Sequence, residues 1–235
     1  TGRLLVEELL KRGLAVKIVV RSLGSLPETV KSHANLSVIH ASILDMSDAD
    51  MARHVRGCHA VVSCLGHNLT FRGLFGGPRR LVTDATHRLC NAIRANEPIE
   101  PVKFVLMNTT GNSNRDLDER VSFGQKCVIG LLRLLLPPHV DNEKAADFLR
   151  TKVGQNDPQI EWAAVRPDGL IDDTEVTDYQ IFKSPTRSAI FDAGTTSRIN
   201  VAHFMAELIN ADKTWNMWQG KMPVIYNSAS VGAGG

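Results

Sequence analysis

Tyrosine is scarce in this sequence of 235 residues, which contains only Tyr179 and Tyr226. Acid–base chemistry that depends on a tyrosine is therefore excluded from residues 1–178. Strong charge of one sign is also missing, because the formal net charge is only +2. A charge this small excludes nucleic acid as an expected partner.

Long apolar runs and ordered cysteine patterns are absent as well. The longest apolar run, residues 127–136, contains Arg133 and is followed by two prolines. It is too short to span a bilayer, so we expect no membrane partner and interpret the run as a buried or interface helix. The four cysteines have neither metal-ligand nor disulfide-framework spacing, which predicts no metal site and is typical of a cytoplasmic protein.

The first 22 residues carry the most informative pattern. Thr1-Gly2 precede an amphipathic segment, residues 3–12, which is closed by Gly13 and followed by an apolar stretch ending in Arg21-Ser22. This order matches the second half of a dinucleotide-binding βαβ unit, with Gly2 at the last glycine of the phosphate fingerprint. The free N–H groups of Gly2 and Arg3 at the helix start are therefore candidates for binding a pyrophosphate.

The end of that second strand predicts the choice of cofactor. An acidic residue there is typical of NAD binding, whereas an arginine fits the additional phosphate of NADP. Arg21 and Ser22 therefore favour NADP, although Arg21 is also consistent with a solvated strand end. Asp45, which follows the apolar stretch 36–40, is a candidate for the adenine side or for a simple helix entry.

Apolar strand-like stretches alternate with helical patterns along the whole chain. Strands are expected at residues 36–40, 59–66, 102–111 and 160–167, and helices from Ser47, at 81–95, at about 121–136 and at 142–153. This alternation predicts an α/β fold with a doubly wound parallel sheet of Rossmann type. We expect a single NAD(P)-binding domain over residues 1–228 and a flexible tail over residues 229–235.

Small and polar residues follow the expected core strands. Ligands of such folds lie beyond the carboxyl ends of the strands, so these residues are candidates for contacting the cofactor or the substrate. The nucleophilic alternative for Cys64 is weaker than buried packing. The candidates are Cys64, Leu65 and Gly66 at the end of stretch 59–66, Asn108 and Thr109 near the end of stretch 102–111, and Arg166 and Pro167 at the end of stretch 160–167.

These segments resemble the atypical short-chain dehydrogenase/reductase superfamily, in particular its NAD(P)H-binding group with NmrA-like and flavin or biliverdin reductase-like proteins. The resemblance extends from Thr1 to about Asn227, and its most specific piece is Glu161-Trp162-Ala163-Ala164-Val165-Arg166-Pro167-Asp168-Gly169-Leu170. The segment from Ser197 to Met205 resembles the later strand end and helix of that group. The resemblance implies a Rossmann-like fold and NADP(H) binding, and it includes both reductases and non-enzymatic sensors.

The catalytic pattern departs from that superfamily. Its reductases place a tyrosine, and a lysine four residues later, on the helix after the fifth strand of the complete fold, but this helix contains His139 and Lys144 and no tyrosine. Tyr179 and Lys183 have the spacing but lie beyond the Arg-Pro strand, so we interpret them as a coincidence. If the protein reduces a substrate, we expect water, His139 or Lys144 to supply the proton and Thr109 to contact the substrate.

Two functions therefore stay open. One is an NADPH-dependent oxidoreductase acting on a small molecule, and the other is an NADP(H)-binding redox sensor. The segments 67–80 and 171–200 are expected on the substrate side, and the first contains Phe71, Arg72, Phe75, Arg79 and Arg80. These residues fit an anionic or planar substrate as well as they fit a solvated loop. The oligomeric state is expected to be a monomer or a homodimer.

The opening segment also predicts residues that precede Thr1. In a complete βαβ unit, a strand and a Gly-x-x-Gly-x turn come before this helix, and the strand is central to the sheet. We therefore expect the fold to be truncated at this strand, with about ten to twelve further residues encoded upstream.

Overall fold

The computed structural model describes residues 1–24, 26–67, 76–117, 119 and 122–228. The expected flexible tail at 229–235 and the aromatic and basic residues Phe71, Arg72 and Phe75 lie outside the described residues.

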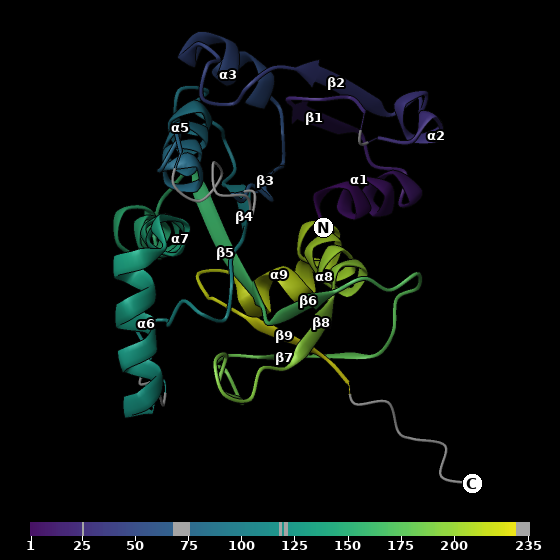
Figure 1. Ribbon diagram of the computed structural model, residues 1–235. Helices are drawn as coiled ribbons and strands as arrows, with labels where there is room; N and C mark the ends of the chain where they lie inside the picture. The colour runs from purple at the N-terminus through teal and green to yellow at the C-terminus, as the bar shows by residue number, and fades with distance from the viewer. Residues whose placement is uncertain (25, 68–75, 118, 120–121, 229–235) are drawn as a thin grey trace, which may run out of the picture.

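Helices and strands alternate through most of the described chain, as the sequence predicted (Figure 1). In chain order the elements are α1 (Gly2–Lys11), β1 (Val16–Val20), α2 (Glu28–Lys31), β2 (Leu36–His40), α3 (Asp48–Val55), β3 (Ala60–Ser63), α5 (Leu81–Arg94), β4 (Val102–Met107), α6 (Phe123–Leu135), α7 (Pro137–Phe148), the short π-helix η1 (Leu149–Val153), β5 (Ile160–Pro167), β6 (Gly169–Ile171), β7 (Tyr179–Phe182), β8 (Thr195–Ser197), α8 (Arg198–Asn210), α9 (Asp212–Trp218) and β9 (Val224–Asn227).

Within the described residues the strands form three sheets. The largest has five strands in the order β3-β4-β5-β9-β7, and all of its neighbours are parallel except the antiparallel pair of β7 and β9. The strands β1 and β2 form a separate parallel pair, and so do β6 and β8. The mainly parallel α/β architecture confirms the predicted fold class.

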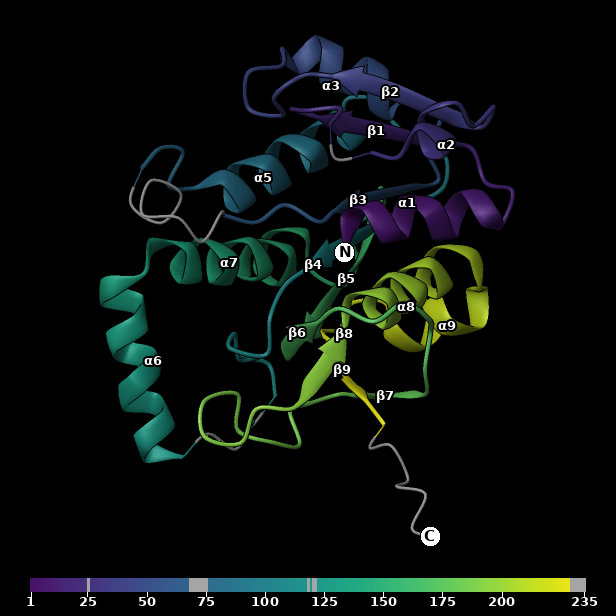
Figure 2. The same ribbon diagram turned by 45° about the vertical axis from the view of Figure 1, so that its right-hand side comes forward.

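Helices cover both faces of the five-stranded sheet (Figure 2). In β4 the side chains alternate, so that Phe104 and Leu106 enter a core with α3, α5 and α7, whereas Val105 enters a core with α1, α8 and α9. In β5, Trp162 and Ala163 divide between the two cores in the same way. Burial of both faces is the reason why these strands are apolar almost throughout.

The β1–β2 pair packs differently from the main sheet. Its side chains Val16, Ile18 and Leu36 contact a small separate cluster that is centred on Leu10, Leu26 and Val30. Within the described residues β1 pairs with β2 alone, and no hydrogen-bonded ladder joins β1 to β3. The upstream strand itself stays a prediction.

Helix ends follow local signals that the sequence contains. Ser47 caps α3, because its Oγ accepts a hydrogen bond of 3.1 Å from the amide of Asp50. Gly13 follows α1 with a φ of 75°, a left-handed conformation that glycine adopts without steric cost.

The boundary between α6 and α7 corrects the sequence analysis. The second helix of this pair was expected to begin at residue 142, but α7 begins at Pro137. The two prolines occupy the first two helical positions, where a missing N–H group costs nothing and the fixed φ favours the helix. His139 and Lys144 therefore lie on one continuous helix.

The apolar helix α6 is not buried in this chain, which corrects one of the two alternatives for residues 127–136. Leu131, Leu134 and Leu135 are exposed by 54%, 80% and 52%. Its role as an interface stays a prediction. Among the described residues, no helix is both long and apolar enough to cross a membrane.

Candidate functional site

The parallel strands β3, β4 and β5 end at one edge of the sheet, and the candidate residues follow these ends. Arg21 directly follows the carboxyl end of β1. The sequence places Cys64 to Gly66 after β3 and Asn108 to Thr110 after β4. In an α/β fold this edge is where ligands bind, so it defines the candidate site.

The start of α1 lies against the end of β3. A Cβ atom on Gly2 would be 3.3 Å from the Cβ atom of Cys64, which is tighter than ordinary contacts. The missing side chain therefore allows the close approach of helix and strand that the sequence predicted. The positive end of the α1 dipole consequently lies beside the carboxyl end of β3.

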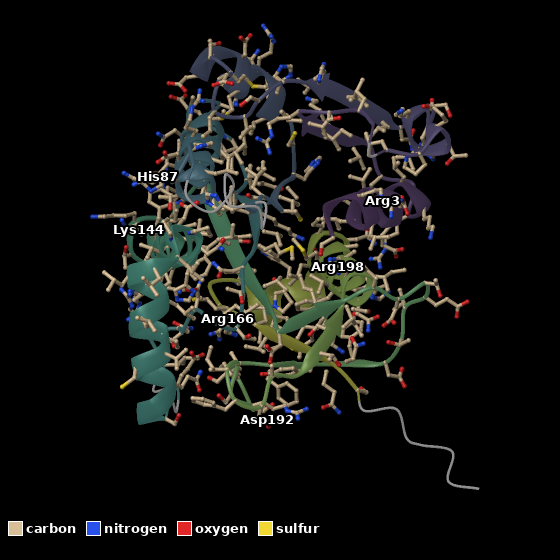
Figure 3. The ribbon with its side chains drawn as sticks, viewed as in Figure 1. Arg3, His87, Lys144, Arg166, Asp192 and Arg198 are labelled. Carbon is tan, nitrogen blue, oxygen red and sulfur yellow. The ribbon has the colours of Figure 1, made fainter. Side chains whose placement is uncertain are left out.

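The side chain of Arg3 pairs with a residue of its own helix and not with a residue at the end of β3. Its exposed guanidinium lies along α1, with Nη1 3.7 Å from Oε1 of Glu7 (Figure 3). Nearby, Arg198 at the start of α8 pairs with Asp172 at 3.0 Å. The backbone amide of Arg3 at the helix start is its candidate contact with a pyrophosphate.

The end of β1 presents a free cation. Arg21 is exposed, and its guanidinium makes no hydrogen bond or ion pair with any described residue. Its carbonyl oxygen accepts a hydrogen bond of 2.9 Å from Nε2 of His40 at the end of β2. Ser22 accepts a bond of 3.3 Å from the amide of Gly24, which forms a tight turn after the strand. These two hydrogen bonds hold the backbone around Arg21, so that its side chain lies at the carboxyl end of β1.

A residue that the sequence analysis missed organises the loop around Asp45. Arg88 of α5 donates hydrogen bonds to the carbonyl oxygens of Ile43 and Leu44 at 3.0 and 2.6 Å, and it pairs with Asp48 at 2.8 Å. Asp45 itself is exposed in the turn that this arginine holds. The signal in the sequence was only an arginine on a helix face, and its partners lie 40 to 45 residues away.

The residues after β3 divide between packing and open space. Cys64 packs against the core with α1 and α8, and Leu65 packs against the opposite core. Burial raises the pKa of the Cys64 thiol to about 11, which agrees with packing and argues against a nucleophile. Gly66 is exposed, and a Cβ atom there would have no neighbour within 4 Å.

Asn108 and Thr110 hold neighbouring segments in place at the end of β4. Nδ2 of Asn108 donates to the carbonyl oxygen of Asn142 in α7 at 3.0 Å, and its Oδ1 accepts from the amide of Thr109 at 2.8 Å. The hydroxyl of Thr110 donates to Asp168 at 3.1 Å. The side chain of Asn108 thus fixes α7 relative to β4, and Thr109 remains half-exposed beside it.

His139 lies next to this strand end. A Cβ atom on Gly111 would be 3.5 Å from Cε1 and 3.8 Å from Nδ1 of His139, and 3.7 Å from Oγ1 of Thr109. The other ring nitrogen, Nε2, is buried and has no hydrogen-bond partner. Burial lowers the pKa of His139, and the nearby carboxylate of Glu143 partly opposes this change. The structure therefore brings together two of the three predicted catalytic residues.

The third predicted catalytic residue lies elsewhere on α7. Lys144 is exposed on the outer side of the helix (Figure 3). Glu143, by contrast, lies beside His139. The distance from His139 Nε2 to Glu143 Oε1 is 3.7 Å. Arg133 of α6 holds both oxygens of Glu143, at 2.7 to 3.1 Å. The carboxylate of Glu143, rather than Lys144, is therefore the charged group next to the ring of His139.

Arg166 has a different task from the predicted cofactor contact. Its side chain is fully buried, and all five of its N–H donors have partners within the protein. Two oxygens of Glu119 accept bonds of 2.7 and 3.1 Å, and the carbonyl oxygens of Met222, Asn112 and Lys183 accept the others.

The end of β5 is therefore used for internal connections. No N–H donor of Arg166 remains available for a ligand. The side chain instead holds three segments of the chain together around β5. Pro167 is buried, and its carbonyl oxygen accepts a bond of 3.1 Å from the amide of Thr110. The next residue, Asp168, accepts hydrogen bonds from the amides of Gly169 and Gly194 at 3.0 and 2.9 Å.

Asp141 connects the loop after β3 with α7, a role that the sequence analysis also missed. Its buried carboxylate accepts bonds from the amides of Val82 and Thr83 at 2.8 and 3.0 Å and from Nε2 of His67 at 2.8 Å. It thereby caps α5 from a neighbouring helix. No local capping motif reveals this contact, since the partners lie almost 60 residues apart.

A family of NAD(P)H-binding proteins matches residues 1–212 of the chain. The chain belongs to this NAD(P)H-binding family. The match confirms the predicted NAD(P)H-binding group. A search of curated proteins finds no match to the chain.

Solved structures show the same fold. A short-chain dehydrogenase/reductase of Veillonella parvula in complex with NADP has 16% identity and a TM-score of 0.68, over 97% of this chain and 90% of that one. The oxidoreductase ylbE of Lactococcus lactis has 17% identity and a TM-score of 0.65, over 97% and 86%. ChuY, an anaerobillin reductase of Escherichia coli O157:H7, has 17% identity and a TM-score of 0.65, over 96% and 91%.

The residues of this family member fit a dinucleotide at several points. The start of α1 approaches β3 closely because Gly2 has no side chain, the surroundings of Gly66 are open, and Arg21 presents a cation without a partner among the described residues. These groups would hold a pyrophosphate, a ribose and an adenosine phosphate respectively. His139 and Thr109 lie farther along the same edge, beyond β4.

Proposed function

We propose that this protein is an NADPH-dependent reductase of a small molecule and that His139 supplies the proton. The observation that carries the proposal is the position of His139, whose ring lies beside Thr109 and Gly111 at the carboxyl end of β4. This is the edge of the sheet where ligands of α/β folds bind. His139 is also the titratable group of α7 that faces this edge in place of the missing tyrosine.

The preference for NADPH over NADH is supported by Arg21. The side chain follows β1 at the place where an arginine accommodates a 2′-phosphate, and no described residue neutralises it. A planar guanidinium pairs with a phosphate through two parallel hydrogen bonds, which is the strong form of this contact. An acidic residue, which would favour NADH, is absent from this position.

The proposed division of labour follows from the surroundings of His139. NADPH, when bound, supplies a hydride. His139 in its protonated form donates a proton to the substrate atom that becomes more basic, and the Thr109 hydroxyl orients the same atom. Glu143 lies on the other side of the ring and stabilises the imidazolium, while Arg133 fixes the position of Glu143.

A change of His139 to Asn tests the catalytic part of the proposal. We expect turnover of NADPH with a panel of quinones, flavins and aldehydes to fall by about 10² or more, which is the usual contribution of a general acid. The affinity for NADPH, measured by calorimetry, should stay unchanged. His59→Asn is the matched control, because His59 is exposed and precedes β3 at the opposite edge of the sheet.

Two outcomes would contradict the reductase. Unchanged turnover in His139→Asn removes this residue from the reaction. Tight NADPH binding by the wild type without turnover of any acceptor supports instead a sensor that binds NADP(H), which the absence of tyrosine from α7 would then explain.

A change of Arg21 to Gln tests the choice of cofactor separately. We expect the affinity for NADPH to fall by about tenfold to a hundredfold, since a charge-assisted phosphate contact is lost. The affinity for NADH should not change, because NADH has no 2′-phosphate. Equal losses for both dinucleotides would contradict a contact with the 2′-phosphate.

A further inference from the structure

A cavity of about 260 Å³ lies between the start of α5, the end of α6 and the first half of α7. Four of its lining residues are cationic, two are apolar and one is acidic. The cations are Arg79, Arg80, Arg133 and Lys144. Arg79 and Arg80 precede α5, whereas Arg133 and Lys144 belong to the consecutive helices α6 and α7, so the folded chain brings the two groups together.

The single acidic residue of the cavity does not neutralise these cations. The carboxylate of Asp141 is 1% exposed, and its two oxygens already accept bonds from two amides of α5 and from His67. Its charge is therefore balanced by the start of α5. Asp141 is therefore not available as an acceptor for Lys144 or Arg80.

The cations differ in how strongly they are already paired. Arg133 is held by both oxygens of Glu143, whereas Arg80 lies 3.4 Å from Asp84 in an exposed pair. Exposed pairs of this kind contribute about 0–1 kcal/mol, so Arg80 exchanges partners at little cost. Lys144 makes no hydrogen bond or ion pair with any residue that the structure describes.

The first turn of α7 adds a positive electrostatic potential to the cavity. Pro137 and Val140 belong to this turn and form the apolar part of the lining. The positive end of a helix dipole stabilises a nearby negative charge. The apolar surface next to the cations matches a ligand that carries its charge on a hydrocarbon body.

From these observations we infer that the cavity binds the carboxylate group of a small organic molecule, with Lys144 and Arg80 as its principal partners. Lys144 and Arg80 each supply a charge-assisted hydrogen bond to the carboxylate oxygens. The apolar side chains of Pro137 and Val140 contact the carbon atoms next to the carboxylate.

The cavity and the proposed reaction lie on different sides of α7. His139 turns Cε1 and Nδ1 toward Gly111, whereas the cavity is lined by Val140, Asp141 and Lys144 on the same helix. The carboxylate site is therefore inferred independently of the proposed reductase function.

Binding without any cofactor tests the inference. Benzoate, its neutral analogue benzamide and inorganic phosphate are titrated into the protein and followed by calorimetry. We expect benzoate to bind and benzamide not to bind, and phosphate to bind more weakly than benzoate. In the double variant Lys144→Gln/Arg80→Gln, the affinity for benzoate should fall by about tenfold or more.

A matched control keeps the result specific. Lys152→Gln removes an exposed lysine from η1, beyond the cavity on the continuation of the same helix, and it should leave benzoate binding unchanged. Thermal unfolding of each variant verifies that the fold is retained. We expect it to be retained, because both cavity positions lie at the surface.

Four results would overturn the inference: no binding of benzoate to the wild type, equal binding of benzamide, tighter binding of phosphate, or full affinity in the double variant. Because the titration contains no NADPH, its failure leaves the reductase proposal standing. Conversely, a protein that binds benzoate in this cavity but oxidises no NADPH retains the carboxylate site and loses the proposed reaction.

Discussion

The five-stranded sheet and the β1–β2 pair, which both contribute to the candidate site, differ sharply in burial. In β4 and β5 nearly every side chain is buried, whereas neither β1 nor β2 contains a fully buried residue. The first pair lies between two helical layers, and the second packs on α1 and α2 through a small cluster. The fold is therefore held mainly by the five-stranded sheet, while the β1–β2 pair presents Arg21 on a less buried support.

The largest expected effect comes from breaking the buried ion pair beside β5. Glu119→Gln leaves the fully buried guanidinium of Arg166 without its counter-charge, and we expect a loss of about 3–5 kcal/mol in the free energy of unfolding. Urea denaturation followed by circular dichroism measures this change.

An exposed ion pair on the β1–β2 side is the control for that variant. Glu28→Gln removes the partner of Lys31 at the surface of α2, and its effect should stay below about 1 kcal/mol. A comparable loss in both variants would contradict the view that the two regions contribute unequally.

A second prediction compares one isoleucine from each sheet. Ile160→Ala in β5 creates a cavity in a closed core and should cost about 2–5 kcal/mol. Ile18→Ala in β1 should cost clearly less, because its side chain is only partly buried. Denaturation of the two variants under identical conditions gives the difference directly.

Hydrogen exchange sharpens the same comparison. Amides of β1 and β2 should exchange faster than those of β4 and β5, since local opening exposes fewer buried contacts there. Equal protection of the two sheets would show that they unfold as one unit despite their different burial.

The smallest expected effect is a shift in the pH dependence of turnover. Burial lowers the pKa of His139, so the protonated acid is lost as the pH rises through a value below the ordinary 6.5. Glu143→Gln removes a nearby negative charge and should move this limb to lower pH. Arg133→Gln should move it to higher pH, because it removes a positive charge near the ring and leaves Glu143 uncompensated.

Rate profiles of NADPH oxidation between pH 5 and pH 8 would measure these shifts, which are expected to be about one pH unit or less. Shifts in the same direction for both variants would contradict the proposed electrostatic arrangement of Arg133, Glu143 and His139.

The sequence predicted the parts of the candidate site that depend on local order. Gly2 marks the close approach of α1 to β3, and Arg21 stands at a strand end that periodicity alone locates. The sequence could not place Arg166, because the four residues that accept its hydrogen bonds lie up to 56 residues away. Nor could it choose between His139 and Lys144 on α7, because the side of the helix that faces the end of β4 depends on how α7 packs against β4 and α6.

By itself, the sequence determined the alternation of strands and helices, the fold class and the edge of the sheet proposed to bind a ligand, because apolar periodicity and small residues act over a few neighbouring positions. Only the tertiary structure decided which side chains are free at that edge. It uses all five donors of Arg166 within the protein, directs Nδ2 of Asn108 to the carbonyl oxygen of Asn142 and brings Arg80, Arg133 and Lys144 to one cavity, because such contacts depend on how distant elements pack.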